Sequence, residues 1–253
     1  MTGLLQDVAQ FAGAAWLSFA VVFLRVGAAM ALLPGFGERA VPPRVRLAVA
    51  IAFTLIVTPA VATGGQDISF LKALGTETVA GLLIGITLRL LIHALEMAGS
   101  IAAQSTSLAQ LFPGAVEPMP VISHLLVWGA LSLAMMAGLH IRVCELFVAS
   151  YDVLPMGRLP DAAIVRDWGI GQIAASFSLA IRIAAPFFAI SFLYNVALGI
   201  INRAMPQLMV AFVGAPAISM GAIVLLALCA PVALSIWVDV LGARIADPFG
   251  AAP

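Results

Sequence analysis

Long apolar runs separated by short polar tracts dominate this chain. The runs cover approximately residues 11–33, 45–62, 79–98, 122–148, 173–201 and 218–241, and polar links are predicted at residues 63–78, 100–120, 154–168 and 204–217. A helix that spans a bilayer needs about 20 apolar residues, so the pattern predicts about six apolar helical segments. The runs 122–148 and 173–201 exceed that length and are expected to tilt or to extend beyond the bilayer.

The composition is that of a protein surrounded by lipid. Of the 253 residues, 63% are hydrophobic and 9% are charged, whereas a soluble domain carries about 25% charged residues. No soluble fold of this length could bury so much apolar surface. The sequence therefore predicts an all-α integral membrane protein in contact with membrane lipid. The formal net charge is zero, which argues against a nucleic-acid partner.

A dense polar cluster at residues 34–46 separates the first two apolar segments. Its Gly and Pro residues predict a turn, and Pro42 and Pro43 suit the start of the next helix, where a missing N–H costs least. Three arginines against one glutamate predict a cytoplasmic position by the positive-inside rule. If every segment crosses the membrane, Arg158 and Arg166 fall outside, against that rule. Either the loop that contains them is an exception to the positive-inside rule, or some segments are hairpins that do not cross the membrane.

Several ionisable residues interrupt the apolar segments or lie near their ends. They are Arg25, Arg89, His93, Glu96, Arg142, Glu145, Arg182 and Arg203. A lone charge in lipid costs at least about 2.5–3.5 kcal/mol. These side chains are therefore expected to face protein, water or headgroups, as intramembrane charges or subunit contacts. Arg142 and Glu145 are three residues apart, and this spacing favours a structural ion pair between them.

The spacing of Arg89, His93 and Glu96 puts them on one face of a helix. One interpretation is a proton relay or substrate site, and the other is a salt bridge at a helix contact or at the membrane boundary. Arg25 is isolated in sequence and needs a partner from another segment or subunit. We consider an intersubunit pair and a snorkelling interfacial position as equal alternatives for it.

The tract Leu108–Pro120 contains a Phe-Pro-Gly and a Pro-Met-Pro sequence, so it cannot remain a regular helix. Irregular backbone at membrane depth is tolerated only where protein or a water-filled cavity surrounds it. The tract is therefore either an ordinary interhelical loop or a plug-like segment that lines a conduit. In the second case apolar contacts would close the pore, with constriction residues Leu108, Leu111, Phe112, Pro113 and Met119.

No catalytic, cofactor-binding or metal-binding pattern is present. The chain has no HExxH sequence, no Gly-x-Ser-x-Gly nucleophile elbow and no P-loop. Its three histidines are scattered. We therefore predict that the protein is not an enzyme and uses no cofactor or metal.

Four stretches of the sequence carry a resemblance to a known family. The looser ones are residues 104–120 and 154–157. The more specific ones contain Pro34, Gly35, Phe36, Gly37, Glu38, Arg39, Pro42 and Arg44 near the N-terminus, and Pro206, Gln207, Gly214 and Pro216 near the C-terminus. In these residues the sequence resembles the FliR family, the export-gate membrane subunits of the flagellar type III secretion apparatus, which is related to the SctT family of virulence injectisomes.

This resemblance implies a subunit that assembles with several copies of FliP and FliQ homologues, near FlhA and FlhB homologues. The helices would form kinked hairpins in a spiral within a helical export-gate assembly. Residues 1–150 would be FliP-like, with the plug loop at 104–120, and residues 170–253 would be FliQ-like. Unfolded flagellar proteins would cross the bacterial inner membrane through this conduit, at the flagellar basal body.

Two other functions are compatible with the sequence. One is the equivalent export-gate subunit of a virulence injectisome, which shares the fold and the mechanism. The other is a secondary transporter that uses Arg89, His93 and Glu96 as a coupling site. Transporters of that class often have two matching halves, and the sequence contains no such symmetry.

Overall fold

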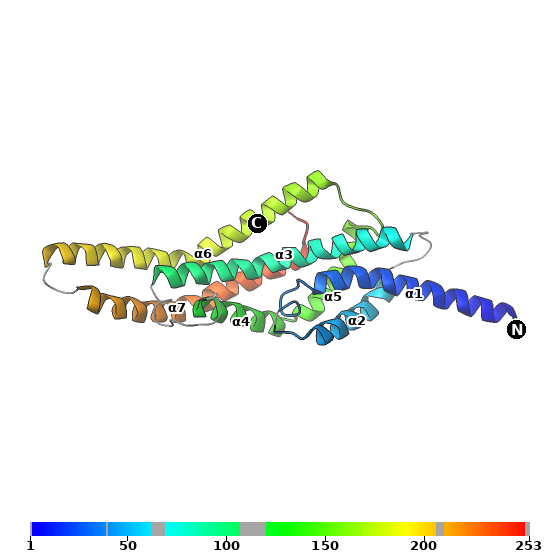
Figure 1. Ribbon diagram of the computed structural model, residues 1–253, viewed down its shortest axis with the longest axis horizontal. Coiled ribbons are helices and arrows are strands. Elements are labelled where there is room, and N and C mark those ends of the chain that lie inside the picture. The colour runs from blue at the N-terminus through cyan, green and yellow to red at the C-terminus, as the bar shows by residue number, and fades with distance from the viewer. Residues whose placement is uncertain (1, 39, 62–68, 107–119, 206–209, 251–253) are drawn as a thin grey trace. The chain divides into compact units, whose positions relative to one another are not determined.

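The computed structural model describes residues 2–38, 40–61, 69–106, 120–205 and 210–250; side chains are described from residue 13 on, except at 14 and 210–216. All regular elements in these ranges are α-helices (Figure 1). They are α1 (Thr2–Met30), α2 (Pro43–Ala60), α3 (Phe70–Ser105), α4 (Val121–Met136), α5 (Leu139–Val153), α6 (Ala162–Ala204) and α7 (Val210–Ala246).

Four of the described helices are long and apolar enough to cross a membrane, and a fifth span results if α4 and α5 are counted as one bent helix. In α7 only 17% of the most apolar stretch is buried. Ile223, Leu228 and Val232 are among its large exposed side chains. Such a surface is stable against lipid or other proteins rather than water. The prediction of an all-α integral membrane protein is therefore confirmed.

The fourth predicted segment is two helices rather than one. α4 ends at Met136 and α5 begins at Leu139, with a break in the helix between them. Gly138, between them, has a φ of 80°, in the left-handed region that glycine enters without steric cost. The apolar pattern runs through this position without interruption, which is why it predicted a single segment.

Two helices begin earlier than the polar links indicated. The link predicted at residues 63–78 is helical from Phe70, and the link at 154–168 is helical from Ala162. Asp161 caps the start of α6, because its Oδ1 accepts a hydrogen bond of 2.7 Å from the Ala163 N–H. Both helices therefore contain polar residues that the sequence pattern assigned to loops.

The described residues divide into two compact units. The first consists of residues 1–89, 135–170 and 243–251, and the second is centred on residues 90–134 and 171–242. In the first unit, Phe53 of α2 packs edge-on against Phe36 and Phe147, with ring centroids 5.6 and 6.4 Å away. In the second, the buried Trp237 indole of α7 donates a 2.8 Å hydrogen bond to the Leu91 carbonyl of α3.

Candidate functional site

A buried ion pair joins α1 to α3 in the first unit. Arg25 lies in α1 and Glu77 in α3, and their side chains are 1% and 0% exposed. The Arg25 Nε–H donates to Glu77 Oε2 at 2.8 Å. Two charges this deeply buried are stable only when they neutralise each other and their remaining hydrogen-bonding groups are satisfied.

The end of α5 supplies further partners for the same guanidinium. Arg25 donates to the Ser150 Oγ at 3.1 Å and to the Leu154 carbonyl at 2.7 Å. The guanidinium carbon also lies 3.6 Å from the centroid of the Tyr151 ring, a cation–π contact. One arginine thus holds α1, α3 and α5 together.

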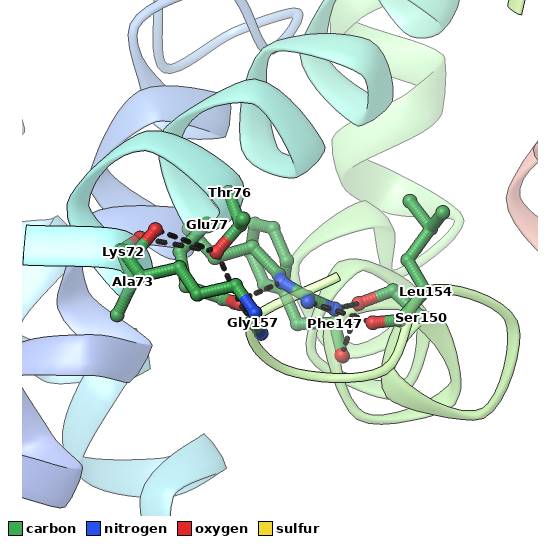
Figure 2. A network of polar contacts seen from close by, with 9 residues as sticks. Lys72, Ala73, Thr76, Glu77, Phe147, Ser150, Leu154 and Gly157 are labelled. Atoms are coloured by element: carbon green, nitrogen blue, oxygen red, sulfur yellow. Dashed lines mark hydrogen bonds and ion pairs between the residues drawn. The ribbon is translucent and has the colours of Figure 1, made fainter. Parts of the chain in front are cut away.

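Glu77 uses its second oxygen to hold the segment after α5. Glu77 Oε1 accepts a hydrogen bond of 3.0 Å from the Gly157 N–H. Gly157 has a φ of 69°, which favours glycine at this position. Figure 2 shows Gly157 next to Glu77, with Ser150 and Leu154 farther along the same network. Arg25, Glu77, Ser150, Tyr151, Leu154 and Gly157 are called the Arg25 cluster below.

The hydrogen bonds of the Arg25 cluster hold helices and a loop in position. Besides their contact with each other, Arg25 and Glu77 form three hydrogen bonds to Ser150 of α5 and to Leu154 and Gly157 in the segment after it. The buried Tyr151 hydroxyl has no hydrogen-bond partner among the described residues. Those residues also contain no group of three or more His, Cys, Asp or Glu side chains that could hold a metal ion.

Small residues allow α1 and α3 to approach closely enough for this ion pair to form. Glu77, Gly81 and Gly85 are spaced four residues apart and share one face of α3. A side chain at Gly81 would collide with the Arg25 carbonyl oxygen, and one at Gly85 would lie 2.9 Å from the Ala29 carbonyl oxygen. The two glycines therefore bring the backbones into contact, as in other membrane helix pairs with this spacing.

Residues 31–38 and 40–42 form a folded turn between α1 and α2, where the polar cluster at 34–46 predicted a turn. Gly35 has a φ of 79°. A side chain at Gly37 would lie 2.6 Å from the Ala31 carbonyl oxygen. Arg46 donates to the carbonyls of Phe36 and Glu38 at 3.2 and 3.0 Å. Each glycine thus occupies a position where a side chain would introduce strain or a clash.

Arg89 pairs with this turn and not with the two other ionisable residues on its helix. Arg89 donates to Glu38 Oε1 at 2.7 Å, and the two side chains are 21% and 17% exposed. His93 Nδ1 and Glu96 Oε2 form a separate contact at 2.6 Å. The three residues therefore belong to two local pairs, which favours the salt-bridge interpretation over a relay.

The other predicted charges are on the surface of the described structure. Arg142 and Glu145 are both exposed, and no ion pair joins them in the described residues, so the predicted structural pair is not formed. Arg182 and Arg203 of α6 are exposed as well. Arg25 forms neither the intersubunit pair nor the snorkelling interfacial position considered for it, because it is buried and its partner, Glu77, is in the same chain.

Some predicted positions lie outside the described residues. These are Arg39, the constriction residues Leu108, Leu111, Phe112, Pro113 and Met119, and the motif positions Pro206 and Gln207. Gly214 and Pro216 lie within α7, in the part of that helix where the structure describes the backbone only.

Glu77 is the charged residue of the Arg25 cluster that the sequence interpretation missed. It was placed in the polar link at residues 63–78, which was recognised from Thr63, Gly64, Gly65, Gln66 and Asp67 at its start. The available signal was its distance of four residues from Gly81, the first residue of the Gly-x-x-x-Gly sequence. That spacing puts a carboxylate on the face of α3 that contacts another helix.

Comparisons with known proteins match almost the whole chain to one family. The family described as Bacterial export proteins, family 1 matches residues 16–243. Flagellar biosynthetic protein FliR of Caulobacter vibrioides is 34% identical over 230 residues, covering 87% of this chain and 91% of the relative. The Escherichia coli protein of the same name is 28% identical over 215 residues, covering 79% and 81%. The chain therefore belongs to the FliR family of bacterial export proteins.

Proposed function

We propose that this protein is a non-enzymatic subunit of the flagellar type III export gate in the bacterial inner membrane, at the flagellar basal body. The similarity to the Caulobacter vibrioides flagellar protein, at 34% identity over 91% of that protein, carries the proposal. A buried cluster that holds helices together and an all-helical membrane fold are consistent with a subunit of an assembly.

We further propose that the exposed apolar faces contact homologues of FliP and FliQ, with FlhA and FlhB homologues nearby. α6 and α7 support this assignment, because only 33% and 17% of their most apolar stretches are buried. Faces of this kind require either lipid or protein neighbours. The division into a FliP-like part at 1–150 and a FliQ-like part at 170–253 belongs to the same proposal.

A clean chromosomal deletion is expected to abolish swimming motility and external filaments, and a plasmid copy of the gene is expected to restore both. The reason is that a conduit subunit is required for every exported filament protein. Electron microscopy of filaments and swimming assays in soft agar measure the result. Normal filaments in the deletion strain would exclude a flagellar role. Loss of virulence-protein secretion instead, with motility intact, would identify an injectisome subunit.

The plug belongs to this proposal, with Leu108, Leu111, Phe112, Pro113 and Met119 as constriction residues. Complementing the deletion strain with the double variant Phe112→Ser and Met119→Ser is expected to retain motility but to make the inner membrane permeable to small ions. Polar side chains hydrate a constriction that apolar side chains keep dry. Growth under salt stress and membrane-potential dyes report the leak. The matched variant Leu125→Ser, at an exposed position of α4, should not leak. Equal permeability in the two strains would contradict the plug assignment.

A further inference from the structure

We propose that the first unit binds one phospholipid with an anionic headgroup, in two adjoining pockets between the start of α3, the loop after α5 and the start of α6. One pocket is lined mostly by apolar side chains, and the other adds a second cationic side chain, that of Lys72. Both pockets are lined by Arg158 and Leu159, so a single amphiphilic molecule can occupy the two together. The inference goes beyond the proposed export function and does not depend on it.

The apolar pocket has the size and lining of a site for an acyl chain. Its volume is about 410 Å³, within the range of about 300–1,000 Å³ that is usual for ligand pockets. Aliphatic and aromatic side chains form most of its wall, including Leu83, Val153, Ile164, Val165, Trp168 and Phe249.

The ring of Trp168 lines this pocket, and its one polar atom already has a hydrogen-bond partner elsewhere. The Trp168 Nε1–H donates to the Pro248 carbonyl at 3.2 Å, and the ring lies 5.8 Å from the ring of Phe249. A hydrocarbon chain can therefore contact the indole without leaving an unpaired donor.

The adjoining pocket has the charge that a phosphate requires. It has a volume of about 580 Å³ and is lined by Lys72, Arg158 and Thr76, among others. The Lys72 and Arg158 side chains are exposed, and neither forms an ion pair in the part of the chain that the structure describes. Lys72 is the sole lysine of the sequence. Two cations on one pocket attract an anionic headgroup.

One carboxylate, that of Asp161, lies on the apolar pocket and must be considered as an opposing charge. Its Oδ1 accepts the Ala163 N–H at 2.7 Å, so it is held at the N-terminus of α6, where the helix dipole stabilises a negative charge. The two cations therefore still exceed the acidic groups on these pockets by one.

The position of the pockets in the fold suits a lipid better than a soluble anion. Lys72 lies two residues after the start of α3, and Asp161 immediately precedes α6, and both helices are long enough to cross a membrane. The pockets beside these apolar helices are therefore within reach of lipid, and tryptophan, present here as Trp168, is enriched at the level of the headgroups. Gly157 lines the basic pocket and is also held by Glu77, so the Arg25 cluster positions one wall of the site.

Quenching of Trp168 fluorescence by brominated lipid tests the proposal on the full-length chain in detergent micelles. Trp16 and Trp128 are 72% and 55% exposed and are replaced with phenylalanine to remove their signal. Trp237 is fully buried and remains as a constant background. Brominated phosphatidylglycerol, added at low molar ratio, is expected to quench Trp168 more strongly than brominated phosphatidylcholine.

Removing the cations should remove this preference. In the double variant Lys72→Gln and Arg158→Gln, the apparent affinity for phosphatidylglycerol is expected to fall by about fivefold for each charge lost. Arg166→Gln is the matched control, because Arg166 is exposed at the start of α6 but pairs with Asp167 and lines neither pocket. The two single variants are measured as well, so that a folding defect of the double variant is not mistaken for a loss of lipid binding.

Equal quenching by the two lipids, or unchanged quenching in both single variants and the double variant, would overturn the proposal. Competition by free glycerol phosphate to the same extent as by phosphatidylglycerol would also overturn it, because the apolar pocket would then contribute nothing. Circular dichroism and gel filtration confirm that each variant is folded. If a strain that expresses the double variant remains motile, protein export does not require these two cations. Lipid preference and motility are measured separately, so either proposal can fail without the other.

Discussion

The variant Glu77→Ala is expected to destabilise the folded chain by about 3–5 kcal/mol, because it leaves the Arg25 guanidinium buried without a counter-charge. It also removes the acceptor for the Gly157 N–H. For a chain of this size, each kcal/mol lost lowers the midpoint of thermal unfolding by about 2–4 °C. The midpoint is therefore expected to fall by about 10 °C. Thermal unfolding of the purified protein in detergent measures the change.

Glu38→Ala is the matched control for this prediction. It also removes the carboxylate of an ion pair with arginine, but the Glu38 and Arg89 side chains are 17% and 21% exposed. Water can therefore solvate the arginine that remains, and the loss should be clearly smaller than for Glu77→Ala. Equal losses in the two variants would contradict the conclusion that burial makes the Arg25 cluster critical.

Replacing both charges should recover part of the stability lost in Glu77→Ala. In the double variant Arg25→Met and Glu77→Met no unpaired charge remains, and such replacements of buried ion pairs are often neutral or stabilising. The recovery is expected to be incomplete, because the Gly157 N–H and the Leu154 carbonyl lose their partners.

Gly81→Ala is expected to be the second most damaging substitution, with a loss of about 1–3 kcal/mol or more. The added methyl group would occupy the position of the Arg25 carbonyl oxygen, a backbone atom that cannot move without shifting α1. Separating α1 from α3 would also lengthen the Arg25–Glu77 contact. Thermal unfolding in detergent and the amount of folded protein in the membrane measure the effect.

Gly75→Ala provides the comparison on the same helix. A Cβ at Gly75 would meet no atom within 4 Å, and alanine is favoured over glycine in a helix by about 1 kcal/mol. This variant should therefore be neutral or slightly stabilising. If Gly81→Ala is tolerated equally well, the close contact of α1 and α3 is not a requirement of the fold.

The apolar pattern was sufficient to predict the class of the protein and most of its helices, because both depend on local composition. The expected segment 45–62 corresponds closely to α2, Pro43–Ala60, whose start is marked by prolines in the sequence. The break at Gly138 was missed, because a glycine within an apolar run is also common in continuous membrane helices. Only the backbone conformation at that residue separates the two cases.

The candidate site could be predicted only in part. Arg25 was recognised as a charge that needs a partner, since an isolated arginine in an apolar segment is costly. Its partners, Glu77, Ser150 and Leu154, lie 52, 125 and 129 residues away. No local pattern contains that information, and Glu77 itself was assigned to a loop.

The sequence by itself determined that this chain is helical, resides in a membrane and resembles the FliR family, because hydrophobic periodicity and short motifs are properties of neighbouring residues. The tertiary structure decided which charges neutralise each other. It paired Arg25 with Glu77 and Arg89 with Glu38, and left Arg142 without Glu145. The physical reason is that a buried charge is stable only beside its counter-charge. The approach of two helices along Gly81 and Gly85, and not the spacing within either helix, brings Arg25 and Glu77 together.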